Sequence, residues 1–504
     1  MTLSRIQSAA FWGLEASLID VEVDVKKGEK FYFIIVGLPD TAVKESKDRV
    51  LTAVRNSGYS LGLVECTINL APGDIKKEGP LYDLPIALAL LHSQGIVTTN
   101  TYKEYLCVGE LGLSGQMRPM RGALSATLLA KKLGKKGIII PIQNEKEALC
   151  IPGIEVIGVE CLRDAAAFLQ NPTSFTKKSF VAPTEKETPS LPLVDFSEIK
   201  GQLLAKRVLE IAAAGGHNLL LFGPPGSGKT LLSKALIGIL PPLSLEEVLE
   251  VTRIYSLLGQ CCGLVKERPF RAPHHTISSV GLVGGGGIPK PGEVTLAHLG
   301  VLFLDELPEF SRSTLEVLRQ PLENKNVTIS RARQAVTFPT NFMFIAAMNP
   351  CPCGFLGHPQ KPCQDTPIQV QRYRSKISGP LLDRIDMHIE VPAMTYKEME
   401  KDASAEPSSS VQERVVAARE TQYRRNGPLK TNALISAKEI AKYCFLNEEC
   451  KKLMQNAMEA MHISARVYSR ILKVARTIAD LDSKPLIESD HLMEALSFRA
   501  LNDE

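Results

Sequence analysis

Residues 217–236 read His-Asn-Leu-Leu-Leu-Phe-Gly-Pro-Pro-Gly-Ser-Gly-Lys-Thr-Leu-Leu-Ser-Lys-Ala-Leu. The apolar run before Gly223 predicts a buried strand, and the pattern after Thr230 predicts a helix. A glycine loop between a strand and a helix points backbone N–H groups at phosphate oxygens. In such a loop Lys229 reaches the β- and γ-phosphates of ATP and Thr230 binds Mg²⁺. The other expected nucleotide-binding residues are Gly223, Pro224, Pro225, Gly226, Ser227 and Gly228.

A second apolar run, 301–304, ends in the acid pair Asp305 and Glu306. We expect Asp305 to hold the Mg²⁺ shell and Glu306 to polarise the attacking water. Glycine patterns also arise by chance. Here the complete loop motif, its flanking strand and helix, and a separate acid pair together favour an ATP site.

The composition bounds the remaining possibilities. A chain of 504 residues predicts about three domains. With 44% apolar and 23% charged residues it is typical of a soluble globular protein. No apolar run approaches the roughly 18 residues that cross a bilayer, and there is no signal-peptide pattern, so we expect a cytoplasmic protein without membrane contact. The net charge of +4 is small, so any nucleic-acid contact must come from local patches.

Two polar stretches rich in Pro and Ser, 177–192 and 403–410, divide the chain. We expect an N-terminal α+β domain at 1–176, a linker at 177–192, an α/β ATPase core at 193–395 and a helical C-terminal lid at 396–504. The eleven cysteines fit reduced thiols better than a disulfide framework.

Residues 77–83 and 108–115 resemble the proteolytic domain of Lon-type proteases, which implies a ribosomal S5 domain 2-like fold for 1–176. In that family a nucleophilic serine follows the first stretch, but Leu81 stands there in this chain. No lysine base is present at 121–128. Because leucine has neither a proton to release nor a lone pair for attack, we expect no protease activity.

Residues 268–275, 348–350 and 379–386 resemble the I subunit of magnesium chelatase and, more distantly, MCM helicases. These proteins form the AAA+ branch that carries hairpin insertions. A Lon-like domain fused to such a core is the layout of the YifB/ComM family of magnesium-chelatase-like ATPases. For ComM-type members the resemblance implies a homo-hexameric DNA helicase that drives branch migration in natural transformation. The alternative is a chelatase-like ATPase that remodels a protein or metal-insertion partner.

The resemblance also implies roles for three further residues. Asn349 matches sensor 1, which orients the attacking water, although it is also a common turn residue before proline. Arg384 matches the arginine finger that reaches into the neighbouring subunit's site, with a surface ion pair to Asp383 or Asp386 as the alternative. Arg466 matches the sensor 2 arginine that contacts the γ-phosphate of the same chain, with Arg470 as its competitor.

Two segments are candidates for DNA contact. Residues 324–338 alternate like a β-hairpin, and we expect its Lys325, Arg331 and Arg333 to contact DNA. Arg331 and Arg333 lie on the same side of its strand, where they can meet phosphates. The same pattern is typical of a charged edge strand. The glycine-rich stretch 279–293 predicts an unpacked pore loop or surface loop, with Lys290 at its tip.

Cys351, Cys353 and Cys363, with His358 between them, supply enough soft ligands for a tetrahedral Zn²⁺ site. Members of the resembling family usually end this group with Cys-x-Cys, whereas Asp365 stands at the last position here. His358 or Asp365 would complete the site; otherwise the cysteines are ordinary thiols.

Overall fold

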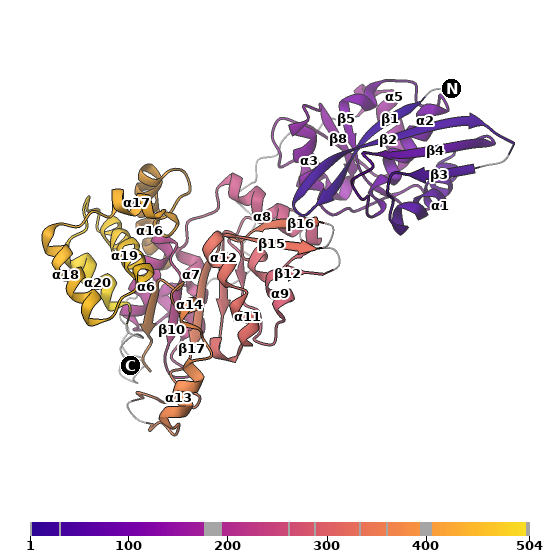
Figure 1. Ribbon diagram of the computed structural model, residues 1–504. Coiled ribbons are helices and arrows are strands. Elements are labelled where there is room, and N and C mark those ends of the chain that lie inside the picture. Colours follow the sequence, from indigo (N-terminus) through magenta and orange to yellow (C-terminus); the bar gives the residue numbers. More distant parts are fainter. Residues whose placement is uncertain are drawn as a thin grey trace. The chain divides into compact units, whose positions relative to one another are not determined.

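The structure, a computed structural model, describes residues 3–29, 32–175, 194–260, 263–286, 289–331, 334–358, 361–393 and 406–499 (Figure 1). The chain divides into two compact units. The first contains the described residues of 1–187 and 244–266, and the second those of 188–243 and 267–504. None of the described helices is long and apolar enough to cross a lipid bilayer.

The first unit is an α+β domain with a four-stranded sheet in the order β1-β2-β4-β3 and a parallel sheet in the order β5-β8-β9. The strands of the larger sheet are β1 (Ser4–Trp12), β2 (Glu15–Lys27), β3 (Tyr32–Val36) and β4 (Val64–Ala71). Those of the smaller sheet are β5 (Tyr105–Cys107), β8 (Gly137–Pro141) and β9 (Glu155–Val159). The helices are α1 (Thr41–Asn56), α2 (Asp83–Ser93), α3 (Ala123–Lys132), α4 (Glu145–Ala148) and α5 (Leu162–Gln170). Leu81 packs against the apolar core beside the smaller sheet, so a core side chain stands where the resembling proteases carry their nucleophile.

Helix α8 (Leu245–Leu258) lies in sequence between the phosphate loop and the acid pair, yet it packs in the first unit. The Ser256 hydroxyl accepts a hydrogen bond from the Gly122 N–H at 3.1 Å and bonds the carboxylate of Glu147. Arg253 donates to the Leu14 carbonyl at 2.9 Å. The linear order of the motifs does not predict that α8 belongs to the first unit, because α8 starts with an ordinary capping box and resembles any amphipathic helix. The other domain boundaries remain predictions.

The second unit is built on a five-stranded parallel sheet in the order β11-β14-β17-β10-β18. The strands are β10 (Leu219–Phe222), β11 (Phe270–Arg271), β14 (Val301–Leu304), β17 (Met343–Met348) and β18 (Met387–Glu390). The three central strands are fully buried apolar runs, as expected for a sheet with both faces covered. Phe222 pairs with Met348 and Leu304 with Ala346, so the residues that follow these strands meet at one edge of the sheet.

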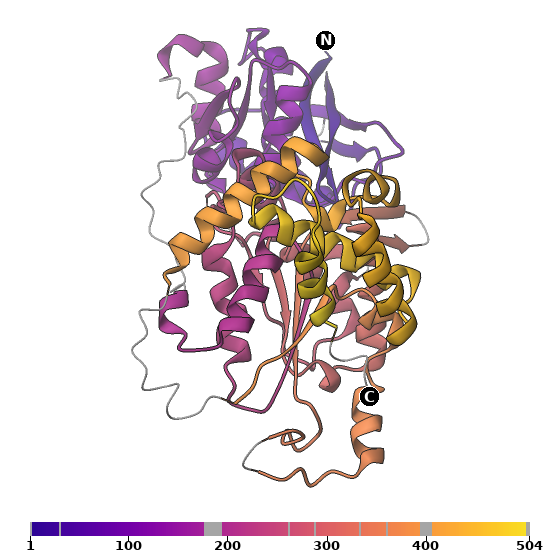
Figure 2. The same ribbon diagram turned by 90° about the vertical axis from the view of Figure 1, so that its left-hand side faces the viewer.

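Helices α6 (Leu203–Gly215) and α7 (Lys229–Ile239) contribute to the core that encloses this sheet. The C-terminal helices pack into the same core and appear in orange and yellow (Figure 2). They are α16 (Ser408–Asn426), α17 (Ala437–Tyr443), α18 (Glu448–Ala460), α19 (Ala465–Leu481) and α20 (Ser489–Ser497). The predicted fold class is confirmed: an N-terminal α+β domain, an α/β core and a helical C-terminal part.

The second unit also contains two hairpins. The predicted one is present as β15 (Asn326–Arg331) and β16 (Gln334–Pro339), preceded by α11 (Arg312–Glu316) and α12 (Arg319–Asn324). The glycine-rich stretch is not simply an unpacked loop, and that expectation was wrong. It folds into α9 (Ser279–Val283), a ladder of β12 (Gly284–Gly285) with β13 (Lys290–Pro291), and α10 (Glu293–Leu296). The glycines permit close packing, since a Cβ on Gly292 would lie 2.4 Å from the Gly284 nitrogen.

Candidate functional site

The phosphate loop joins β10 to α7 and is shaped by its glycines. Gly226 and Gly228 adopt φ values of +78° and +88°, which side chains disfavour. A Cβ on Gly223 would lie 2.1 Å from the Val391 carbonyl oxygen, so only glycine fits there. The loop therefore begins against β18 and ends as the N-terminus of α7, where unpaired N–H groups attract phosphate.

Lys229 opens α7 and turns its ammonium back toward the loop. The Nζ atom donates to the carbonyls of Gly223 at 2.7 Å and Pro224 at 2.8 Å, and lies 3.4 Å from Asn349 Oδ1. Burial lowers the pKa of Lys229. Asn349 directly follows β17, so the structure brings together the two side chains expected to face the γ-phosphate.

Asp305 and Thr230, the two residues expected to hold Mg²⁺, lie within hydrogen-bond distance of each other. The Thr230 hydroxyl donates to Asp305 Oδ2 at 2.7 Å, and the other carboxylate oxygen accepts the Glu306 N–H at 2.9 Å. A hydroxyl and a carboxylate at this spacing are oxygen ligands of the kind that Mg²⁺ prefers.

Glu306 has a left-handed backbone (φ +51°) that turns its exposed side chain at the end of β14. His275 Nδ1 lies 3.7 Å from Glu306 Oε2. Sequence reasoning missed His275 as a neighbour of the site. Its place shortly after β11, whose partner strand β14 ends in the acid pair, was the available signal.

Arg384 and Arg466 lie at the opposite edge of the sheet. The Asn218 amide, just before β10, donates to the Arg384 carbonyl at 3.0 Å, whereas the phosphate loop follows the other end of β10. Arg384 bonds the carboxylate of Glu323, and Arg466 Nη2 lies 3.6 Å from the same carboxylate. The structure thus places Arg466 beside Arg384, and its predicted contact with a γ-phosphate in the same chain stays a prediction.

These arginines line a cavity of about 560 Å³ at the amino edge. Five cationic side chains face it (Lys325, Arg384, Arg466, Arg470 and Lys473), against the two acids Glu323 and Asp386. The Lys325 ammonium donates to the Phe342 carbonyl at 3.4 Å, and burial lowers its pKa to about 8. Lys325 therefore points into this cavity and not outward from the hairpin, which corrects its assignment to DNA contact.

The remaining DNA candidates belong to the two hairpins. Lys290 is exposed on β13. Arg331 ends β15 with its backbone paired to Gln334, and Arg333 lies outside the described residues. The hairpins are neighbours, because a Cβ on Gly284 would lie 2.9 Å from Ile329 Cδ1, and a groove is lined by residues of both β12 and β15.

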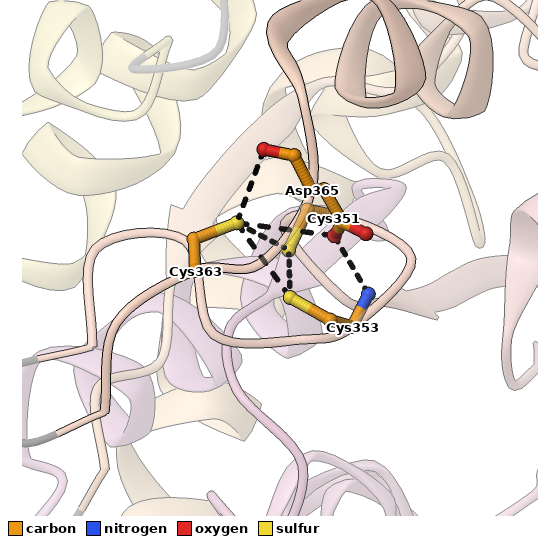
Figure 3. A group of neighbouring side chains, drawn as sticks. All are labelled: Cys351, Cys353, Cys363 and Asp365. Atoms are coloured by element: carbon orange, nitrogen blue, oxygen red, sulfur yellow. Dashed lines mark hydrogen bonds between the residues drawn. The ribbon is translucent and has the colours of Figure 1, made fainter.

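The three predicted cysteines converge in the loop after Asn349 (Figure 3). Their sulfurs lie 3.4 to 3.6 Å apart, close to the ~3.8 Å that Zn–S bonds of ~2.3 Å set in a tetrahedron. The fourth member is Asp365, with a carboxylate oxygen 3.8 Å from the Cys363 sulfur. His358 is not part of this group. Its Nδ1 instead accepts the Lys361 N–H at 3.1 Å, so the assignment of His358 as a ligand was wrong.

Hydrogen bonds from Cys353 hold the pKa of Asp365 below its ordinary value, and Asp365 Oδ2 accepts the Cys353 N–H at 2.8 Å. A carboxylate and three thiols at these distances fit a tetrahedral Zn²⁺ ion. The cluster also adjoins the nucleotide site, since a Cβ on Gly354 would lie 2.7 Å from Pro225 of the phosphate loop.

The strand order, the phosphate loop, the acid pair and the polar residue after β17 define a P-loop ATPase of the AAA+ class, which uses a nucleotide and Mg²⁺. Family models agree. The model of the magnesium chelatase subunit ChlI matches residues 195–399, a second ChlI model matches 21–144, and the ChlI C-terminal model matches 405–499.

Two relatives align along nearly the whole chain, and a third aligns along part of it. YifB of Escherichia coli (strain K12) is 44% identical over 505 residues, covering 100% of this chain and 98% of its own. The competence protein ComM of Haemophilus influenzae is 42% identical over 510 residues, covering 99% and 98%. Lon protease 2 of Bacillus subtilis is 28% identical over 190 residues, or 34% of each chain. The protein therefore belongs to the YifB/ComM family of magnesium-chelatase-like AAA+ proteins.

Proposed function

We propose that the protein is an ATP-driven ring motor that remodels DNA, acting as a ComM-type branch-migration helicase in natural transformation and recombination. One observation carries the ring: each chain holds the phosphate loop and acid pair at one edge of its sheet and a cationic cavity at the other. Head-to-tail association of identical subunits joins the two half-sites and closes into a ring. A homo-hexamer is the expectation from the family.

In this proposal one subunit binds ATP and its neighbour completes the site. Lys229 neutralises the β- and γ-phosphates, Thr230 and Asp305 hold Mg²⁺, and Glu306 takes the proton of a water oriented by Asn349. Arg384 of the neighbour neutralises charge that develops on the γ-phosphate. Arg466 lies beside Arg384, so we assign it to the same neighbouring half-site.

The paired hairpins are the proposed DNA-contacting elements. They carry Lys290, Arg331 and Arg333, whose cations would bind phosphates without reading sequence. The Haemophilus influenzae relative is a competence protein, which supports DNA as the partner.

The test is the ATPase rate with and without single-stranded, duplex and branched DNA, with Lys229→Ala as the blank. We expect DNA to stimulate the wild-type rate, and Lys290→Ala to weaken that stimulation while leaving the rate without DNA unchanged. A rate that no DNA alters, together with no DNA binding in the presence of ATP, would exclude the helicase proposal.

A second candidate is a chelatase-like ATPase that remodels a protein or metal-insertion partner. The matches of three ChlI family models favour it. Under this alternative a protein partner would stimulate the ATPase and branched DNA would not, so the same assay discriminates the two.

We also propose that Cys351, Cys353, Cys363 and Asp365 bind a structural Zn²⁺ ion. Zn²⁺ would supply no chemistry of its own and would tie the loop after Asn349 to the segment that carries Cys363. Metal analysis of the purified protein should give one zinc per chain, Cys363→Ser should lose it, and His358→Ala should keep it. Equal zinc contents in wild type and Cys363→Ser would contradict the site.

A further inference from the structure

Glu323 is the acid that pairs with two arginines of the cationic cavity. It lies in the last turn of α12, and its carboxylate contacts both Arg384 and Arg466. The hydrogen bond from Arg384, reinforced by the charges of Arg466 and Arg470, holds the pKa of Glu323 below its ordinary value, so the group is ionised. Its side chain is 50% exposed. An ion pair with one exposed partner contributes little to stability and can exchange for another anion.

Arg384 retains hydrogen-bonding capacity that Glu323 does not use. The residue is only 8% exposed, and its Nη1 donates to the Pro380 carbonyl at 2.7 Å. Its Nε atom is buried and has no hydrogen-bond partner among the described residues. Buried donors are normally paired, and a guanidinium fork is suited to the two or three oxygens of a phosphate group. The unpaired donor therefore points to a second ligand for this arginine.

The other acid of the cavity is already paired with other groups. Asp386 accepts the Asn218 N–H at 2.8 Å and bonds Arg470. Of the described residues that line the cavity, Glu323 alone brings an acid to Arg384 and Arg466. Its single charge faces an excess of cations, so an anion of higher charge would compete with it effectively.

We propose that Glu323 holds the Arg384 and Arg466 side chains until a phosphate-class anion displaces it. In the assembled protein that anion is the terminal phosphate of ATP bound by the adjoining subunit. The identity of this source rests on the proposed ring, whereas the exchange of Glu323 for phosphate does not.

The backbone of Lys325 connects Glu323 to the β15–β16 hairpin. Two residues later Lys325 ends α12 with φ +55°, and its N–H donates to the Pro321 carbonyl at 3.1 Å. The Lys325 carbonyl accepts the Thr340 N–H at 2.9 Å and so closes the base of the β15–β16 hairpin. A shift of Glu323 is thus transmitted to the hairpin proposed to touch DNA, and the occupancy of one subunit's nucleotide site would be reported to the next subunit's DNA-contacting element.

Titration of the full chain with inorganic phosphate by calorimetry tests the exchange. All proteins carry Lys229→Ala, which weakens phosphate binding at the loop. We expect Glu323→Gln to bind phosphate about tenfold more tightly than the parent, because the competing charge is gone while the shape is kept. Glu323→Asp keeps the charge and should resemble the parent. Adding Arg384→Ala to Glu323→Gln should remove the gain. Equal affinities of the parent and Glu323→Gln would overturn the proposal.

Hydrogen exchange at 326–331 and 334–339 provides the second readout. Phosphate should change exchange at the hairpin base in the parent, and Glu323→Gln should show the changed pattern without phosphate. A hairpin that responds to neither would overturn the transmission step. Glu323→Gln could gain phosphate affinity while Arg384→Ala leaves ATP hydrolysis by neighbouring subunits unchanged. That result would identify free phosphate as the ligand, and it would reject the proposed ring but not the Glu323 exchange. An effect on neighbouring subunits without the gain would reject the Glu323 exchange alone.

Discussion

Glu306 is a residue whose backbone and surroundings both suit one chemical role. Its left-handed φ of +51° places the carboxylate beyond the end of β14, and a non-glycine residue in that conformation commonly marks a functional site. The neighbouring Asp305 is bonded to Thr230 and to the Glu306 N–H, an arrangement that suits a metal ligand better than a base.

We predict that Glu306→Gln binds ATP with near wild-type affinity and hydrolyses it at least about 100-fold more slowly, the usual contribution of a general base. Binding of a fluorescent ATP analogue and single-turnover hydrolysis measure the two effects. Rapid turnover by this variant would remove Glu306 from its assigned role.

Lys325 gives a pH signature. Its pKa is about 8 in the folded protein and ordinarily 10.5, so below pH 8 the folded state bears the cost of a buried charge. Between pH 8 and 10.5 the unfolded chain binds more protons at this site, so stability rises with pH until the cost vanishes. Lys325→Met should stabilise the second unit near pH 7 by at most about 3 kcal/mol.

Urea unfolding of the wild type, Lys325→Met and the exposed-lysine control Lys290→Met across this pH range measures the effect. The difference between wild type and Lys325→Met should shrink as pH rises from 8 to 10.5, while Lys290→Met should follow the wild type. A difference that does not change with pH would contradict the burial of this ammonium.

At the scale of single residues, the sequence predicts whatever a local motif determines. Lys229, Thr230, Asp305 and Asn349 meet as expected, because strand ends in a parallel sheet share one edge. The roles of Arg466 and Lys325 depend on long-range packing. Position in the motif could not reveal that one begins a helix at the opposite edge, or that the other turns inward at a helix end. Similarly, Asp365 and not His358 completes the cysteine group because of how the loop folds back.

Helix α8 is the element that sequence order places least well. Its last turns complete the first unit through Ser256, whose hydroxyl links the Gly122 N–H to the buried carboxylate of Glu147. Glu147 is 3% exposed, and burial raises its pKa. Loss of one of its few hydrogen-bond partners should therefore destabilise the structure around Glu147.

We predict that Ser256→Ala loosens α8 and α3 by about 1–3 kcal/mol, the cost of leaving buried polar groups unpaired. Hydrogen exchange of these two helices should accelerate by about tenfold or more, while α16 in the second unit is unchanged. Thr421→Ala, which removes a hydroxyl that hydrogen-bonds the Ala417 carbonyl at the surface of α16, serves as the control. If α3 exchange were unaffected by Ser256→Ala, the contact would have no role in holding α8.

Of the two hairpins, one could be predicted from the sequence pattern and the other could not. Alternation identifies β15 and β16 because strand period and turn are local properties. The ladder of β12 and β13 escaped recognition because its glycines contribute no side-chain pattern. They allow backbones to approach, which only the folded structure reveals.

At the scale of the whole molecule, the proposed ring divides each ATP site between two chains, so that one chain would carry two incomplete halves. The side with the phosphate loop carries the groups expected to bind ATP and activate water. The amino edge of the same sheet carries Arg384 and Arg466, which contact Glu323. In the proposed ring neither half would hydrolyse ATP efficiently without the other, since a finger arginine is worth several orders of magnitude in related chemistry. Identical subunits would therefore have to associate head to tail, each using its neighbour's cavity.

Mixing two inactive variants tests this requirement most directly. Lys229→Ala lacks the loop lysine but offers an intact Arg384, and Arg384→Ala has the reverse defect. In randomly mixed rings about a quarter of the interfaces join an intact Lys229 to an intact Arg384. We predict that each variant alone is nearly inactive and that an equal mixture recovers a substantial fraction of the wild-type ATPase rate. No recovery in rings shown to exchange subunits would contradict a shared site.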